Sequence, residues 1–174
     1  EGGVILYPTD TVWGIGCDPT NEQAVQKIYD LKRRADSKAM LLLTDSMAKV
    51  QAYVTDVPDV VWDLVECAEK PLTVIYPQGR NLATNLMAQD GSVGIRITNE
   101  AFSKQLCMRF KKPIVSTSAN VSGQPTPAFF DEISEEIKAG VDYIVQARQD
   151  DREKKQPSSI IKFEKNGTFA IIRE

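Results

Sequence analysis

The chain has 174 residues, 42% hydrophobic and 26% charged as in an ordinary globular protein, and it carries a formal net charge of −3. It contains no histidine, which excludes a Ser-His-Asp triad, a Cys-His nucleophile and histidine-containing zinc sites. Any catalysis must therefore use lysine, arginine, hydroxyl, amide or carboxylate groups, the backbone, or a metal carried by a ligand. The mildly negative net charge disfavours a protein that binds nucleic acid over its whole surface.

The length predicts a single domain over residues 1–174. No segment has about 18 consecutive apolar residues and none resembles a signal peptide, so we expect no membrane contact. The cysteines Cys17, Cys67 and Cys107 are odd in number and form no CxxC pair, which favours a reducing, cytoplasmic location. Because a strand pattern follows Glu1 almost at once, we expect a short native N-terminal segment to be missing, and we expect no C-terminal extension domain.

Hydrophobic periodicity predicts strands and helices that alternate along most of the chain. The expected strands are residues 3–8, 39–43, 72–76, 92–97, 113–119, 142–147, 158–164 and 168–174. The expected helices are residues 21–34, 46–54, 58–70, 99–110 and 129–140. Asn21 is the expected N-cap of the first helix, and Asn166-Gly167 predicts a hairpin between the last two strands. This order predicts an α/β fold of the α+β type, with a mixed, partly parallel sheet and helices packed on it.

The stretch "YPTDTVWGIG" at residues 7–16 combines polar side chains with two glycines after a strand. Gly14 and Gly16 resemble the start of a dinucleotide-binding loop, but Pro19 stands at the third glycine position and no Walker A sequence is present. We interpret the two glycines as the corner of a turn. The "TDT" at residues 9–11 is costly to bury without partners, so it forms either a cap or Asx-type turn, or a ligand contact.

Basic residues gather at the end of the first expected helix: Lys32, Arg33, Arg34 and Lys38. They either compensate the helix dipole or form an anion clamp. Lys32 and Arg34 lie about 200° apart around an ideal helix, so they can converge on one ligand only if the helix ends between them.

Two further polar features interrupt apolar strands. "STSANVSGQPTP" at residues 116–127 places hydroxyls and an amide where a strand ends, which suits phosphate or adenosine oxygens. Arg96 lies inside an apolar strand on the face of Gly94, and it is either a snorkelling side chain or a bidentate receptor for a carboxylate. The charge-rich segment 148–157 is either a solvated loop or a lid over a ligand.

A series of stretches follows the order typical of the YrdC-like family, the threonylcarbamoyl-adenylate synthases, which the chain resembles over nearly its whole length. They are "YPTDTVWGIG" (7–16), "KRR" (32–34), "PLT" (71–73), "VGIRI" (93–97), "STSANVSG" (116–123), "PSSI" (157–160) and "IIR" (171–173). The resemblance implies a twisted, mixed YrdC-like sheet with a concave ligand groove. It also implies a nucleotidyltransferase that joins L-threonine, bicarbonate and ATP into threonylcarbamoyl-AMP and releases pyrophosphate, with Mg²⁺ carried on the ATP phosphates.

The resemblance further implies site residues and partners. The implied threonine contacts are Thr11, Arg96, Ser116 and Ser158 or Ser159. The implied ATP contacts are Lys32, Arg34, Lys38, Ser92, Ser118, Asn120, Thr126 and Arg173. Lys32 and Arg34 are expected to supply the catalytic positive charge, and no metal ligand is expected from the protein. The expected macromolecular partners are proteins that transfer the threonylcarbamoyl group to tRNA, with tRNA or double-stranded RNA as a direct contact.

The chain also departs from the family pattern. Trp13 stands for a usual tyrosine, Ala35 and Thr98 stand for usual prolines, and Leu43 stands where some members carry histidine. "EKPLT" retains only part of a Pro-Gly-Pro-Leu-Thr stretch. Two alternatives therefore stay open: a nucleotide-binding paralogue with another acceptor, or an RNA-binding module that uses the basic residues 32–38.

Overall fold

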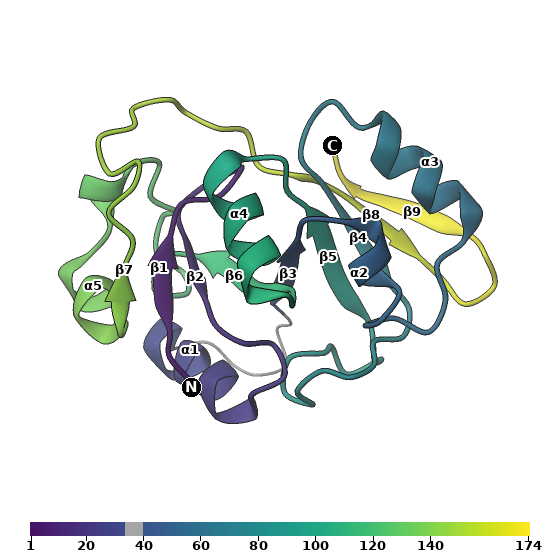
Figure 1. Ribbon diagram of the computed structural model, residues 1–174, viewed down its shortest axis with the longest axis horizontal. Coiled ribbons are helices and arrows are strands. Elements are labelled where there is room, and N and C mark those ends of the chain that lie inside the picture. Colours follow the sequence, from purple (N-terminus) through teal and green to yellow (C-terminus); the bar gives the residue numbers. More distant parts are fainter. Residues whose placement is uncertain (34–39) are drawn as a thin grey trace.

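The computed structural model describes residues 1–33 and 40–174, which form one mixed sheet with helices packed on it (Figure 1). The strand order is β7-β1-β2-β6-β3-β5-β4-β8-β9. The strands are β1 (Ile5–Tyr7), β2 (Gly14–Gly16), β3 (Leu41–Thr44), β4 (Leu72–Tyr76), β5 (Val93–Ile97), β6 (Ile114–Ser118), β7 (Tyr143–Ile144), β8 (Ser159–Phe163) and β9 (Phe169–Arg173). The helices are α1 (Glu22–Lys32), α2 (Met47–Val50), α3 (Asp59–Cys67), α4 (Ala101–Phe110), α5 (Glu135–Gly140) and the 3₁₀ turn η1 (Phe130–Glu132).

The sheet combines both strand directions. The pairs β1/β7, β3/β5 and β4/β8 are parallel, whereas β1/β2, β2/β6, β3/β6, β4/β5 and β8/β9 are antiparallel. The final hairpin turns at Asn166-Gly167, where Gly167 has a φ of +85° that suits glycine. The expected α/β fold with a mixed, partly parallel sheet is therefore confirmed.

The helices cover the sheet and lie at its ends. In Figure 1, α4 crosses the centre of the sheet and α1 lies below the N-terminal strands. The expected cap of α1 is confirmed, because Asn21 Oδ1 accepts from the Ala24 N–H at 3.0 Å, and Ala24, Val25 and Ile28 are fully buried. Among the residues that the structure describes, no helix has both the length and the apolar character needed to cross a bilayer.

Two expected helices are shorter than their patterns predict. The helix expected over 46–54 is only the short α2 and ends in turns. The helix expected over 129–140 is interrupted: Ile133 has an extended backbone with ψ 129°, and Ser134 then caps α5 by accepting from the Ile137 N–H at 3.3 Å. A serine side chain that bonds to the nearby backbone favours a new helix start over an uninterrupted helix.

The interpretation of Gly14 and Gly16 as a turn corner is wrong. Both lie in strand β2, which pairs with β1 and β6 on its two sides. The structural reason for glycine is close approach, since a Cβ at Gly16 would collide with the Val115 carbonyl oxygen and lie 2.6 Å from Tyr7 Cε1. The absence of a side chain at Gly16 lets β2 lie close to Val115 of β6 and to the ring of Tyr7 in β1.

Replacing Gly16 with alanine is therefore expected to destabilise the fold. The added methyl group meets backbone and a buried ring, so we expect a loss of about 2 kcal/mol or more in the free energy of unfolding, measured by urea denaturation. Gly3→Ala is the matched control, because a Cβ there lies no closer than 3.9 Å to Asp142. Equal stabilities of the two variants would contradict the packing argument.

Candidate functional site

A cleft of about 770 Å³ runs across one face of the sheet, from β2 to β9. Its lining alternates along the strands, for example Thr73 and Ile75 in β4 or Gly94 and Arg96 in β5, as expected for side chains on one face. The predicted site residues that line the cleft are Thr11, Ser92, Arg96, Ser116, Ser118, Thr126, Ser158 and Arg173. The fold thus brings together side chains from both ends of the chain, such as Thr11 and Arg173.

The charges that line the cleft have one sign. Its ionisable side chains are Arg96, Lys154, Lys155 and Arg173, and no carboxylate is among the lining residues that the structure describes. The whole chain, in contrast, carries a net charge of −3. A cleft with basic and hydroxyl groups and no carboxylate favours an anionic ligand.

Arg96 is the most deeply buried of these cations, with 3% of its surface exposed. Its Nε donates to both carboxylate oxygens of Asp10 at 3.1 Å, and its Nη2 lies 2.9 Å from Asp10 Oδ1. Nη2 also donates to Thr11 Oγ1 at 3.2 Å. Arg96 therefore does bind a carboxylate in a bidentate manner, but that carboxylate belongs to the protein.

One edge of the Arg96 guanidinium remains for a ligand. Within the described part of the chain, Nη1 has only a long contact of 3.5 Å to Thr73 Oγ1. An arginine has five N–H donors in a fixed fork, and Asp10 and Thr11 take those on the Nε and Nη2 side. The arrangement fixes the plane of the guanidinium and leaves Nη1 to meet an anion in the cleft.

The loop at residues 9–11 contains the predicted local turn, whereas its contact with a ligand stays a prediction. Thr9 forms a local turn: its Oγ1 accepts from the Thr11 N–H at 3.1 Å and donates to the Val12 carbonyl at 2.6 Å. Asp10 and Thr11 instead contact Arg96, and Thr11 also lines the cleft. Sequence reasoning did not identify Asp10, although its position between two threonines was the available signal.

Lys32 contacts the polar loop that follows β6. Its Nζ donates to the carbonyls of Ser118 at 2.5 Å and Asn120 at 2.7 Å, and only 2% of the residue is exposed. Neither Lys32 nor Asn120 lines the cleft. Arg33 has a left-handed backbone with φ 51°, so α1 does end between Lys32 and Arg34. Arg34 and Lys38 lie outside the described residues.

Asn120 is fixed by its amide nitrogen, while its amide oxygen has no such contact. Nδ2 donates to the Val121 carbonyl at 3.1 Å and to the Gln124 carbonyl at 2.8 Å. Oδ1 is buried and accepts no hydrogen bond from the part of the chain that the structure describes. A buried acceptor of this kind usually has a partner, so Asn120 remains a candidate for contact with a ligand.

Two hydroxyls connect Arg96 with Arg173. Thr73 Oγ1 lies 2.8 Å from Ser158 Oγ, and Arg173 donates to the Ser158 carbonyl at 2.8 Å and to Ser158 Oγ at 3.3 Å. Ser158 is buried and lines the cleft. Ser159 instead begins β8, pairs with Leu72 and does not line the cleft, which favours Ser158 of the two predicted serines.

The segment 148–157 (the strap) crosses the top of the molecule in Figure 1 between β7 and β8. Arg148 is its anchor, with Nη1 2.9 Å from Glu100 Oε1 and 3.0 Å from the Thr9 carbonyl, and Nη2 2.8 Å from Asp151. Further along the strap, Lys154 and Lys155 line the cleft. Sequence reasoning identified the strap by its charge but did not single out these residues.

The two buried thiols do not suit a nucleophilic role. Burial raises the pKa of Cys17 and of Cys107 to about 12, so both are protonated at neutral pH. No group of three histidine, cysteine, aspartate or glutamate side chains placed to hold a metal occurs among residues 1–33 and 40–174. The polar side chains that line the cleft are cationic or carry hydroxyl groups.

Glu100 links the strap anchor to α4 and is expected to make stability depend on pH. Burial raises its pKa, but hydrogen bonds from Ser103 and Phe102 and the charge of Arg148 outweigh burial and leave the pKa below its ordinary value. We expect Glu100→Gln to lower the free energy of unfolding by about 1–2 kcal/mol near pH 7. This difference shrinks as the pH falls through the lowered pKa, because Glu100 then becomes protonated and neutral.

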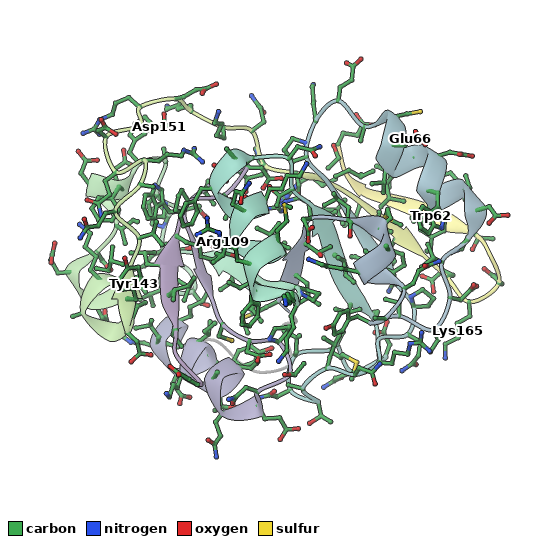
Figure 2. All side chains as sticks on the ribbon, in the orientation of Figure 1. Trp62, Glu66, Arg109, Tyr143, Asp151 and Lys165 are labelled. Carbon is green, nitrogen blue, oxygen red and sulfur yellow. The ribbon has the colours of Figure 1, made fainter. Side chains whose placement is uncertain are left out.

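Urea denaturation of both proteins from about pH 7 to about pH 3 measures this difference. Glu66→Gln is the control, because Glu66 is exposed on α3 (Figure 2) and does not cap α4. A stability difference that stays constant over the pH range would show that Glu100 acts through packing alone.

Comparison with known proteins finds one protein family. The Sua5/YciO/YrdC family model, described as "Telomere recombination", matches residues 1–174. A threonylcarbamoyl-AMP synthase of Pseudoalteromonas translucida is 37% identical over 148 residues, which cover 83% of this chain and 79% of the relative. A protein of the same name from Acinetobacter baumannii is 33% identical over 168 residues, covering 92% and 87%.

Solved structures agree with this fold. P. abyssi Sua5 in complex with L-threonine has a TM-score of 0.81 at 21% identity, covering 93% of this chain and 47% of that chain. E. coli YciO has a TM-score of 0.83 at 23% identity, covering 99% and 83%. Full-length HypF, in a phosphate- and nucleotide-bound form, has a TM-score of 0.82 at 22% identity, covering 99% and 27%. The chain thus spans about half of P. abyssi Sua5 and most of YciO.

Proposed function

The chain belongs to the Sua5/YciO/YrdC family, and from this membership we propose that it is a threonylcarbamoyl-AMP synthase. It is an enzyme of the transferase type that uses ATP as a substrate, with L-threonine and bicarbonate as the other substrates. The observation that carries the proposal is the lining of the cleft, which has basic and hydroxyl groups and no carboxylate among the residues that the structure describes. The chain is also 33–37% identical to synthases of that name. We assign the reaction to the nucleotidyltransferases, with pyrophosphate as the leaving group.

The proposed chemistry needs no histidine and no protein nucleophile. The amine of threonine and bicarbonate form a carbamate and water. A carbamate oxygen then forms a bond to the α-phosphorus of ATP, while the bond from that phosphorus to the bridging oxygen of the β-phosphate breaks and pyrophosphate leaves. The enzyme must hold the reactants in line and neutralise the growing phosphate charge, which lysine, arginine and phosphate-bound Mg²⁺ can do.

Arg96 is the proposed receptor for the carboxylate of threonine. Its Nη1 edge faces Thr73 at the cleft wall, and Asp10 already fixes the other edge. Thr11 and Ser116 are proposed to contact the same substrate, with Ser158 preferred over Ser159. Because Asp10 balances the Arg96 charge, a single carboxylate binds there mainly through directed hydrogen bonds.

The nucleotide is proposed to occupy the rest of the cleft. The proposed ATP contacts are Ser92, Ser118, Asn120, Thr126, Arg173, Lys32, Arg34 and Lys38. Lys32 supports this role by fixing the loop that carries Ser118 and Asn120. A direct contact between Lys32 and phosphate stays a prediction, as do the catalytic roles of Lys32 and Arg34.

The product is proposed to serve tRNA modification, in which partner proteins transfer the threonylcarbamoyl group to an adenosine next to the anticodon. The alternative of an RNA-binding module is less well supported. Lys32 is buried against the loop after β6, and Arg33 forms an ion pair with Glu136. Two cations of the proposed RNA patch therefore already have partners in the protein.

The direct test is pyrophosphate release by the whole chain with ATP and Mg²⁺. We expect release only when L-threonine and bicarbonate are both present, and a background rate in degassed buffer or without threonine. The nucleotide product, separated by chromatography, should contain both threonine and AMP. Release that needs neither substrate would overturn the proposal, whereas release with a different amine would identify a paralogue with another acceptor.

Removing the buried charge pair is expected to separate threonine binding from ATP binding. The double variant Asp10→Asn/Arg96→Gln removes both charges, so no unpaired charge stays buried. We expect it to weaken threonine binding by about 30-fold or more and ATP binding by less than about 3-fold. Titration calorimetry with each substrate measures both effects. Arg109→Ala, an exposed arginine on α4 labelled in Figure 2, is the control. Equal losses for both substrates would show that Arg96 has a different role.

A further inference from the structure

The strap brings two adjacent lysines, Lys154 and Lys155, into the lining of the cleft. Its path is fixed on both sides of them. Before the lysines, Arg152 forms a bidentate pair with Asp131 at 2.7 and 2.8 Å. After them the chain enters β8, where the Ser159 N–H donates to the Pro71 carbonyl at 3.0 Å. The lysines thus lie at a defined place above the sheet face and not on a free loop.

The anchor of the strap reaches the part of the site that holds Arg96. Arg148 donates to the carbonyl of Thr9, the residue before Asp10, and pairs with Glu100 at the start of α4. Arg148 also has a left-handed backbone with φ 61°, which is uncommon for a residue other than glycine. Its side chain contacts Thr9, Glu100 and Asp151, and these contacts fix the strap relative to the loop at residues 9–11.

The two lysines differ in their partners. Lys155 forms an ion pair with Glu153 at 2.6 Å, and Glu153 itself is exposed and does not line the cleft. Lys154 is exposed and forms no hydrogen bond or ion pair with the residues that the structure describes. Lys154 therefore brings a positive charge to the cleft that no described carboxylate balances, and Lys155 can exchange an exposed partner for a ligand.

Arg96 and the lysines suit different anions. Arg96 is already neutralised by Asp10 and presents directed donors, which matches one carboxylate. A triphosphate carries several negative charges spread over many oxygens, and flexible ammonium groups neutralise such charge as point cations. The lysines extend from the strap over the cleft, and Arg173 lies at the β9 end of the same lining.

We propose that Lys154 and Lys155 bind the phosphates of the nucleotide and neutralise the leaving pyrophosphate. This inference rests on the proposed function, since it assigns a further part of the same site. As the bond between the α-phosphorus and the bridging oxygen breaks, that oxygen gains negative charge. The ammonium groups stabilise this charge without taking part in covalent chemistry.

The test compares Lys154→Ala/Lys155→Ala with the control Lys70→Ala/Lys165→Ala, which removes the same charge from exposed sites outside the cleft. Figure 2 shows Lys165 at the opposite end of the molecule from Asp151 of the strap. Titration calorimetry of each variant uses ATP, adenosine and L-threonine as separate probes. We expect the strap variant to bind ATP about 10-fold or more weakly than the control does, and its ATP binding to depend less on salt. We expect its affinities for adenosine and for threonine to lie within about 2-fold of those of the control.

An unchanged ATP affinity, or an equal loss for adenosine, would overturn the inference. Lys154→Arg/Lys155→Arg is expected to restore most of the ATP affinity, because it returns the positive charge. The outcomes also separate the two proposals. A wild-type chain that binds ATP through the lysines but forms no threonylcarbamoyl-AMP contradicts only the proposed function. A chain that forms threonylcarbamoyl-AMP, but whose ATP affinity is unchanged when the lysines are replaced, contradicts only this inference.

Discussion

The rest of the site depends on one constraint, a guanidinium buried in the middle of the sheet. Arg96 has almost no exposed surface, so its charge requires a partner inside the protein, and Asp10 supplies that partner from a loop 86 positions earlier. The loop at residues 9–11 must then approach β5 closely. The turn at Thr9 sets its shape, and the contact of Arg148 with the Thr9 carbonyl fixes it from the other side.

The same constraint explains why the cleft is electropositive in an acidic protein. Asp10 neutralises Arg96 but is not part of the lining, so the ligand meets the donor edge of the pair and not its carboxylate. Hydroxyls from β4, from β6 and from Ser158, the residue before β8, supply much of the remaining polar surface. A chain without histidine can in this way hold a polyanion and its acceptor together, and positioning and charge supply the catalysis.

Sequence patterns predicted the parts of the structure that depend on local physics. The cap at Asn21, the hairpin at Asn166-Gly167 and the mixed sheet are confirmed, because capping, turn and periodicity signals act over a few residues. The pairing of Asp10 with Arg96 and the entry of Lys155 into the cleft were not predicted, since both depend on contacts between distant segments. Gly16 was misread for the same reason: its neighbour Val115 is close only after the sheet forms.

The hydroxyl pair between Arg96 and Arg173 links the two ends of the cleft by a chain of side-chain contacts. Thr73 Oγ1 and Ser158 Oγ lie 2.8 Å apart, and in the hydrogen bond between them one hydroxyl donates its proton and the other accepts it. Each hydroxyl also faces a guanidinium that can only donate. An anion that draws Arg173 away from Ser158 therefore changes the acceptor capacity that Thr73 can offer to Arg96. By linkage, any influence of a ligand at one of these arginines on binding at the other acts with equal strength in both directions.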